Sequence, residues 1–396
     1  MKQAPRFQTT TGKGHGFSAS GRISPYFDGV ERAGGRGYRN HGPTYVPWSY
    51  PESAAEQYEA VTKRVTLWDT ATEQQLQVKG KDARRFVDRL VTRNLLKVKP
   101  GRCTYTFVCN EAGTIICDPV LMVLDEETIW LSQSKTDLLY WAKGIALDGD
   151  YDVEISVPEV APLQVQGPKS RDLLRKLSAY PIDDLRFFGC VKTTVAGIEA
   201  IISRTGWTGE LGYEIYPVGI AQYPWGKDVG MQLWDAVLKA GEEYGILVTQ
   251  FLWARAMESG ITIFDGTDKG LNPLEFWRET VVDFDGDDFI GKEALIKIRA
   301  AGGPKRKMVG LVAESDADRI EPGEWDLPIM DGETIVGTTR RYAFSPTLNR
   351  AIALALVDRS HATIGQKLVI ENSAGPTSVS VTALPFIDPE GARARA

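Results

Sequence analysis

Histidine is scarce in this chain of 396 residues, with His15 and His41 near the N-terminus and His361 near the C-terminus. A histidine-based catalytic triad or a two-histidine metal site would require these distant residues to converge, and we expect neither. The chemistry left to the chain is that of carboxylates, tyrosines and a cofactor that brings its own reactivity.

Cysteine is also sparse, and the four residues are Cys103, Cys109, Cys117 and Cys190. Their spacing matches neither a set of zinc ligands nor a disulfide framework. We therefore expect no metal and a reducing, cytoplasmic location.

Long apolar runs are missing as well. No run reaches the ~18 residues that a membrane-spanning helix needs, and the N-terminus lacks the apolar stretch of a signal peptide. A net charge of −6 and a sequence pI of about 5.4 argue against nucleic acid as the main partner. We expect a small-molecule partner, no nucleic acid and no membrane, and we leave a homo-oligomer open.

The length predicts two or three domains, at roughly 150 residues per domain. Residues 1–45 are rich in glycine and serine and basic, which predicts an irregular N-terminal arm. Residues 46–284 mix helical and strand-like patterns, which predicts an α+β region. Residues 285–390 carry short β runs separated by turns, which predicts a small all-β module.

Asp118 is the most conspicuous single residue. The strand-like runs Cys103–Cys109 and Thr114–Leu124 flank the turn Asn110-Glu-Ala-Gly113, which predicts a β-hairpin with this acid inside its second strand. A buried carboxylate is unfavourable unless a partner pairs with it. Asp118 is therefore either an acid on the solvated face of an edge strand or an acid that awaits a cationic or proton-donating ligand.

A family resemblance rests on ordered motifs spread over about residues 50–385. They are Leu67-Trp-Asp-Thr, Asn94-Leu-Leu-Lys-Val-Lys-Pro-Gly-Arg-Cys-Thr-Tyr105, Leu163-Gln-Val-Gln-Gly-Pro-Lys169, Arg204-Thr-Gly-Trp-Thr-Gly-Glu-Leu-Gly-Tyr-Glu214, Phe289-Ile-Gly-Lys-Glu-Ala-Leu295 and Phe344-Ser-Pro-Thr-Leu-Asn-Arg350. With this spacing the chain resembles the T-protein (aminomethyltransferase) superfamily of tetrahydrofolate-dependent enzymes. The resemblance implies a folate-binding α+β region of two intertwined subdomains over 46–284 and a β-barrel domain over 285–390.

Several residues depart from the glycine-cleavage T-protein pattern. Pro119 follows Asp118 where the family has Leu, and Cys117 precedes it where an acid is common. Ala71-Thr72 replaces the family's Ser-His. The segment around Trp130-Leu-Ser and the following Asp137-Leu-Leu-Tyr-Trp-Ala-Lys-Gly-Ile-Ala146 looks like the dimethylsulfoniopropionate demethylase branch of the superfamily.

The resemblance implies that tetrahydrofolate accepts a methyl group at N5. Asp118 is then the catalytic carboxylate, stabilising positive charge at N5 more than acting as a general base. Tyr105, Trp207 and Glu214 match folate-binding positions. Arg255 stands beside Ala256, where the family usually has Arg, and we expect it to substitute in binding the glutamate tail of folate. Core packing, a solvated strand acid and a surface ion pair are the structural alternatives for these residues.

Substrate choice is expected to rest on tryptophans. Trp68, Trp130 and Trp141 fall in the matched N-terminal half, and indole faces attract methylated cations. Ordinary packing is the alternative for each.

The first functional hypothesis is a tetrahydrofolate-dependent demethylase acting on a small sulfonium or quaternary ammonium acid. An O-demethylase of a methoxy-aromatic is the second hypothesis. This reaction needs a proton donor near the ether oxygen, and no single residue in the sequence stands out in that role. A glycine-cleavage aminomethyltransferase is the third, and the departures near Asp118 argue against it. A non-enzymatic folate-binding protein of iron–sulfur assembly is the fourth, and its Lys-Gly-Cys-Tyr-type motif is absent.

Overall fold

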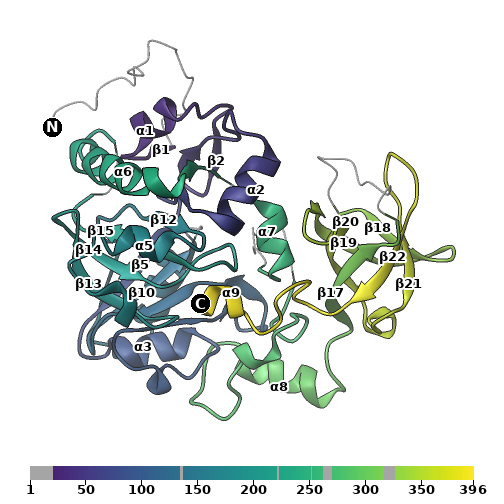
Figure 1. Cartoon of the computed structure of the whole chain (residues 1–396). Helices are drawn as coiled ribbons and strands as arrows, with labels where there is room; N and C mark the ends of the chain where they lie inside the picture. The colour runs from purple at the N-terminus through teal and green to yellow at the C-terminus, as the bar shows by residue number, and fades with distance from the viewer. Residues whose placement is uncertain (1–20, 134–136, 221–222, 251, 262–269, 316–325) are drawn as a thin grey trace.

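The computed structural model describes residues 21–133, 137–220, 223–250, 252–261, 270–315 and 326–396. A larger body of helices and sheets stands beside a smaller β-barrel (Figure 1). This arrangement confirms the predicted α+β class with a C-terminal all-β barrel. In the described part of the chain, no helix combines the length and the apolar character that crossing a membrane requires. The cytoplasmic location and the homo-oligomer stay predictions.

The prediction of an irregular N-terminal arm is wrong for residues 21–45, and residues 1–20 lie outside the described part of the chain. A three-stranded sheet with the order β1-β3-β2 begins here, together with helix α1. The bounds are β1 Arg22–Ile23, α1 Phe27–Arg32, β2 Arg39–His41 and β3 Thr44–Val46. Tyr26 is buried against Trp234 of helix α6, Lys227–Gly241, with ring centroids 6.0 Å apart. Apolar residues among the glycines therefore fix a segment whose composition suggests disorder.

A six-stranded sheet forms the first layer of the larger body. Its order is β13-β14-β15-β12-β4-β16, antiparallel except for the β4–β16 pair. The strands are β4 Thr66–Asp69, β12 Leu163–Gln166, β13 Cys190–Val195, β14 Ile198–Ser203, β15 Gly212–Pro217 and β16 Leu247–Val248. The associated helices are α2 Ala54–Lys63, α5 Ser170–Leu174 and α6 Lys227–Gly241. One cluster of buried side chains joins α6 to this sheet.

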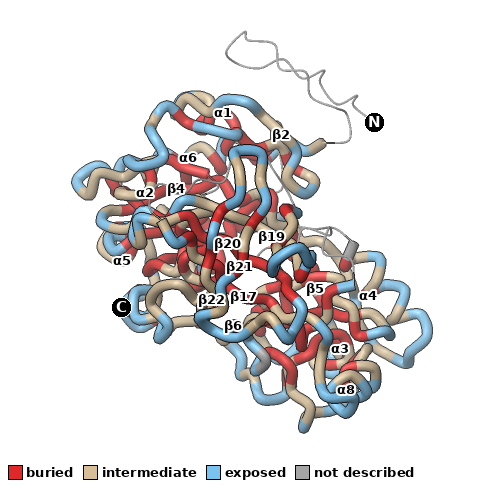
Figure 2. The backbone as a smooth tube through the Cα atoms, turned by 90° about the vertical axis from the view of Figure 1, so that its right-hand side faces the viewer, coloured by how far each residue is buried: buried red, intermediate tan, exposed pale blue. Residues whose placement is uncertain are grey.

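A five-stranded sheet forms the second layer, with the order β11-β5-β10-β9-β6. Its strands are β5 Gln74–Lys79, β6 Arg102–Tyr105, β9 Val120–Val123, β10 Thr128–Gln133 and β11 Glu154–Ser156. Helices α3 Ala83–Leu90 and α4 Asp137–Leu147 pack on it. Met122, Trp130, Ile201 and Tyr216 share one buried cluster, so the two sheets pack against each other. Figure 2 shows this buried backbone in red beneath exposed helices and loops.

The barrel is closed, with the order β17-β20-β19-β18-β21-β22. Its strands are β17 Arg306–Ala313, β18 Pro328–Asp331, β19 Thr334–Ser345, β20 Arg350–Asp358, β21 Lys367–Ile370 and β22 Thr377–Thr382. The first barrel strand begins at Arg306, later than the boundary expected near residue 285. Phe289, Leu295 and Ile298 instead pack in a cluster with Leu274 and Val282, and α8 Lys292–Ala300 lies in this linking segment.

The remaining elements are short and lie mostly at connections. Helix α7, Trp253–Glu258, packs against β19 of the barrel, and α9, Ala392–Arg395, returns to the larger body (Figure 1). The short strands β7 and β8 span Val108–Cys109 and Ile115–Cys117. The 3₁₀ turns are η1 Leu95–Lys97, η2 Ile182–Asp184, η3 Glu242–Tyr244, η4 Glu279–Val281 and η5 Arg359–His361.

Candidate functional site

A cavity of about 800 Å³ opens where both sheets of the larger body meet the segment that follows the barrel. Residues 68–73 at the end of β4, residues 102–105 of β6 and residues 204–214 line it from the body. Residues 385–395 line it from the C-terminal side. Ser132 and Gln133 on β10 and several further segments add to the wall, so many distant parts of the chain have to fold before this site exists.

Asp118 lies at a break in the predicted hairpin. The hairpin forms, but β8 ends at Cys117 and β9 begins at Val120, because Pro119 has no N–H with which to continue the ladder. The carbonyl of Pro119 accepts the Thr106 N–H at 3.2 Å across the break. The hydroxyl of Tyr105 donates to Oδ2 of Asp118 at 3.0 Å. The break places a half-buried carboxylate in the cavity wall, so Asp118 and Tyr105 come together there.

Glu214 lies on β15 and is buried at the cavity wall. Its Oε2 accepts hydrogen bonds from the Tyr216 hydroxyl at 2.9 Å, from Ser203 Oγ at 3.4 Å and from the Thr205 hydroxyl. Burial raises the pKa of this carboxyl group, and the three hydroxyl donors oppose that rise. The group is thus held firmly in place, with donors that favour its ionised form.

Glu73 is a cavity residue that sequence reasoning missed. It lies in the link between β4 and β5, and Ser132 Oγ donates to its Oε2 at 3.0 Å. Burial, followed by the negative charges of Glu214 and Asp118, raises the pKa of Glu73 to about 8, although the Ser132 hydrogen bond lowers it. In the sequence Glu73 is only an acid next to a predicted strand, and no local pattern signals its neighbours.

The predicted tryptophans divide into two groups. Trp68 lines the cavity with Trp207, and their rings meet edge to face with centroids 6.3 Å apart. Trp130 is buried between the two sheets, where its Nε1 donates to Gln77 at 3.0 Å. Trp141 packs on the five-stranded sheet from α4. The expected cage of three tryptophans is therefore corrected, because packing places Trp130 and Trp141 outside the cavity wall.

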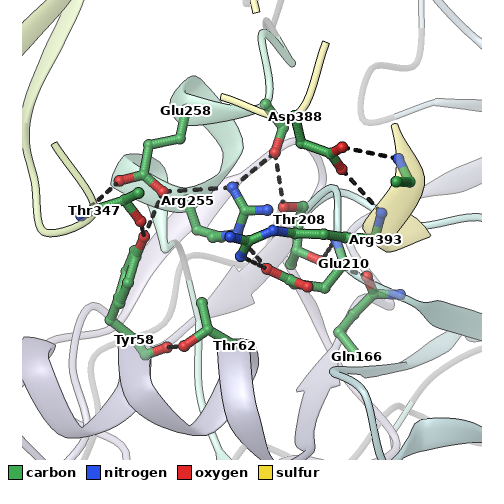
Figure 3. A network of polar contacts seen from close by, with 12 residues as sticks. Tyr58, Thr62, Gln166, Thr208, Glu210, Arg255, Glu258, Thr347, Asp388 and Arg393 are labelled. Carbon is green, nitrogen blue, oxygen red and sulfur yellow. Dashed lines mark hydrogen bonds and ion pairs between the residues drawn. The ribbon is translucent and has the colours of Figure 1, made fainter. Parts of the chain in front are cut away.

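Arg255 is also placed differently from the expectation. Its side chain is fully buried on α7, with Nε 2.9 Å from Glu210 and Nη1 3.4 Å from Glu258. Nη1 also donates to Ser259 Oγ at 2.8 Å. Figure 3 shows the guanidinium between the two carboxylates, with Arg393 of α9 approaching Glu210. Arg255 is not part of the cavity wall, and its contacts are those of an internal ion pair instead of a folate-binding arginine.

Three buried glutamines in the cavity wall leave polar atoms without a hydrogen-bond partner among the described residues. These atoms are Gln133 Oε1, Gln164 Nε2 and Gln250 Oε1. Buried amide atoms are normally paired, so unpaired ones indicate places that a ligand or water satisfies. A pterin ring presents both N–H donors and carbonyl acceptors, and Gln164 Nε2 together with the carboxylates of Glu214 and Asp118 provides both complements. The donor set therefore fits a folate.

The C-terminal segment is the second feature that the sequence did not reveal. Residues 385–395 contribute to the cavity wall although they follow the last barrel strand. Arg393 Nη1 donates to Glu210 at 3.0 Å, and Arg204 Nη2 donates to the carbonyl oxygen of Ala396 at 2.6 Å. The guanidinium of Arg395 lies 4.7 Å from the ring centroid of Phe187. These contacts hold α9 across one side of the cavity.

Comparison with known proteins covers nearly the whole chain. A family model of the GCVT N-terminal domain matches residues 28–285, and one of the glycine cleavage T-protein C-terminal barrel domain matches residues 306–388. Dimethylsulfoniopropionate demethylase DmdA of Ruegeria pomeroyi is 30% identical over 362 residues, which is 91% of this chain and 96% of that protein. An aminomethyltransferase of Thermoanaerobacter sp. is 33% identical over 342 residues, which is 82% of this chain and 88% of the relative.

A solved structure has the same fold. The glycine cleavage system aminomethyltransferase T from Bartonella henselae matches with a TM-score of 0.81 at 20% sequence identity. The match covers 92% of this chain and 98% of that one. The two-sheet body and the barrel are thus a shared architecture.

Proposed function

The chain belongs to the glycine cleavage T-protein family, whose members are tetrahydrofolate-dependent one-carbon transferases, and we propose that it is a demethylase that transfers a methyl group from a small cationic donor to N5 of tetrahydrofolate. The observation that carries this proposal is the meeting of Asp118, Glu73 and Glu214 in one cavity beside the indoles of Trp68 and Trp207. Sulfonium and quaternary ammonium acids are the donor classes that this wall suits.

The charge balance of the reaction explains why carboxylates belong there. In a methyl transfer from an onium donor, one positive charge leaves the donor and appears at the acceptor. Carboxylates fixed between the two positions stabilise that charge throughout the transfer, which is worth a few kcal/mol in a site shielded from water. Tetrahydrofolate supplies the nucleophilic nitrogen when bound.

The residues of this chain have separate roles in the proposal. Asp118, held by the Tyr105 hydroxyl, stabilises charge at the acceptor nitrogen. Glu214 holds the N–H groups of the pterin, supported by its three hydroxyl donors. Trp207 and Trp68 exclude water, and an indole face turned to the methyl group contributes about 0.5–2 kcal/mol per cation contact.

A methoxy-aromatic donor is the second candidate, and the observation that favours it is Glu73. A departing phenolate needs a proton, and a carboxyl group whose pKa is about 8 still carries one at neutral pH. A glycine-cleavage reaction is the third candidate, on the strength of the aminomethyltransferases among the relatives.

The test is to incubate the protein with tetrahydrofolate and one candidate donor at a time, and to measure 5-methyltetrahydrofolate by chromatography. Dimethylsulfoniopropionate, glycine betaine and vanillate represent the sulfonium, ammonium and methoxy-aromatic classes. We expect product from a sulfonium or ammonium acid. Methylenetetrahydrofolate from an aminomethyl carrier protein, with no methyl product from any donor, would refute the demethylase proposal.

A further inference from the structure

Three carboxyl groups reach the same part of the cavity from separate segments. Glu73 comes from the β4–β5 link, Asp118 from the β8–β9 link and Glu214 from β15. The demethylase chemistry gives roles to Asp118 and Glu214, which leaves Glu73 without one. Glu73 is partly buried, and the charges of both other acids act on it.

The side chains that act on Glu73 come from β5, β10, β15 and the β8–β9 link. Ser132 of β10 donates to it, and Gln75 Nε2 in turn donates to Ser132 Oγ at 3.0 Å, so the carboxyl group has a fixed position. The Tyr216 hydroxyl on β15 lies within electrostatic reach of Glu73 and donates to Glu214. Burial first, and then the negative charges of Glu214 and Asp118, raise the pKa of Glu73 to about 8, against the lowering effect of the Ser132 hydrogen bond.

The same wall carries an independent sign of a ligand. Gln133 Oε1 and Gln250 Oε1 are acceptors on side chains more than nine-tenths buried, and neither has a hydrogen-bond partner in the described part of the chain. A donor that enters this space meets acceptors and acids. That environment stabilises positive charge.

Building on the proposed function, we propose that Glu73 is the proton-releasing residue of the methyl-donor subsite: it is neutral before the donor binds and ionises when a sulfonium or quaternary ammonium acid binds beside it. The O–H bond of Glu73 breaks, its electron pair stays on the carboxylate, and the proton leaves to solvent. No oxidant or reductant is involved. The permanent positive charge of the donor offsets the negative charge of the ionised Glu73, whereas Asp118 and Glu214 only repel that charge.

The same residue can close the cycle. The departing product keeps its carboxylate but has lost its positive charge with the methyl group, so Glu73 is again an ionised acid among acids. The acceptor nitrogen must lose a proton, and Glu73 is then a base able to take it. One proton is released for each methyl group transferred, and Glu73 returns to its neutral form.

The experiment measures proton release on donor binding without any folate. Calorimetric titrations in phosphate and in Tris at pH 7 give the number of protons released, because the two buffers differ in ionisation enthalpy. The probes are dimethylsulfoniopropionate and glycine betaine. The control is the thioether acid that remains when dimethylsulfoniopropionate loses one methyl group, since it keeps the carboxylate but has no positive charge.

For the wild type we expect about 0.9 proton released per cation bound, because a group with a pKa of about 8 is about nine-tenths protonated at pH 7. The thioether acid should release none. Glu73→Gln should abolish the release, whereas Glu154→Gln, at an exposed acid on β11 outside the cavity wall, should keep it. Affinity for the cations should rise about tenfold per pH unit from pH 6 towards 8 in the wild type and stay level in Glu73→Gln.

The inference is overturned if wild-type protein binds the cations without releasing a proton, if Glu73→Gln releases as many, or if neither cation binds. The comparison of cation with thioether acid uses wild-type protein and so does not depend on how any variant folds. The product assay separates the two proposals. Formation of 5-methyltetrahydrofolate without proton release leaves methyl transfer standing and removes this role of Glu73, while no methyl product from any donor removes the proposed function itself.

Discussion

Replacing Arg255 by Met should destabilise the protein far more than it weakens folate binding. The Arg255 guanidinium is fully buried between Glu210 and Glu258, at 2.9 and 3.4 Å. Glu258 also accepts hydrogen bonds from Ser345 Oγ at 2.5 Å and from the Thr347 N–H at 3.3 Å, which link α7 to the barrel. The substitution leaves both acids buried without their shared cation.

The expected loss in the free energy of unfolding depends on which hydrogen-bond and ion-pair partners Glu210 and Glu258 retain. Removing one partner of a buried ion pair typically costs about 3–5 kcal/mol, because the remaining charge is left uncompensated. Glu210 keeps Arg393 at 3.0 Å, and that arginine is 43% exposed and a weak substitute. Glu258 keeps its hydroxyl and N–H donors. We therefore expect a loss near the lower end, about 3 kcal/mol in the free energy of unfolding.

Urea unfolding followed by circular dichroism measures this loss. The matched control is Arg32→Met, at an ion pair with Asp235 in which both side chains are more than half exposed. Such a pair contributes about 0–1 kcal/mol, so the control should stay close to wild type. If Arg255→Met unfolds within about 0.5 kcal/mol of the wild type while its Kd for tetrahydrofolate polyglutamate rises, the burial argument is refuted. Arg255 would then be the folate contact that the family resemblance implies.

Further predictions concern the cavity and its C-terminal wall. Asp118→Asn should lower kcat by about a hundredfold with little change in the Kd of folate, and an equal loss of both would mean that Asp118 only holds the folate. Trp207→Leu should raise the KM of a cationic donor by about 2–30-fold, and an unchanged KM would remove this indole from the donor site. Glu73 has a folded-state pKa of about 8, whereas an unperturbed glutamate has a pKa of 4.5, so the wild type should lose stability as pH rises from about 4.5 to 8. Thermal unfolding should show Glu73→Gln stabilised more at pH 8 than at pH 5, and a constant difference would contradict the raised pKa. Arg393→Ala removes a contact between α9 and Glu210, so hydrogen exchange of residues 389–396 should quicken without change in the barrel.

The fold class, and the cavity residues that lie inside long motifs, could be predicted from the sequence. Asp118, Tyr105 and Glu214 all line the cavity, because each sits inside an extended pattern whose spacing is tied to the fold. The strand break at Pro119 was not predicted, because the sequence pattern placed Asp118 inside one continuous strand. The missing N–H of Pro119 ends the strand and turns the neighbouring acid toward the cavity.

The features that the sequence did not reveal depend on contacts between distant segments. Glu73 is chemically unusual because the fold buries it and because β15 and the β8–β9 link bring other acids to it. Trp130 and Trp141 share the composition expected of a cation site, but packing decided their positions. Arg255 is adjacent to the expected position, and a shift of one residue on a helix turns a side chain by about 100°.

In the cavity wall, acidic side chains act on an acid and basic side chains act on a base. This separation of charge bears on which methyl donor the cavity can bind. Burial, then the charges of Glu214 and Asp118, raise the pKa of Glu73, whereas burial lowers the pKa of Arg278, with Arg395 and Arg93 adding to the lowering and Tyr105 opposing it. Neighbouring acids thus add to the effect of burial on the Glu73 carboxyl group, and neighbouring guanidinium groups add to the effect of burial on Arg278. A ligand with a cationic head and a carboxylate tail would relieve both. An onium acid has that form, so the unrelieved charges favour it over a neutral methyl ether.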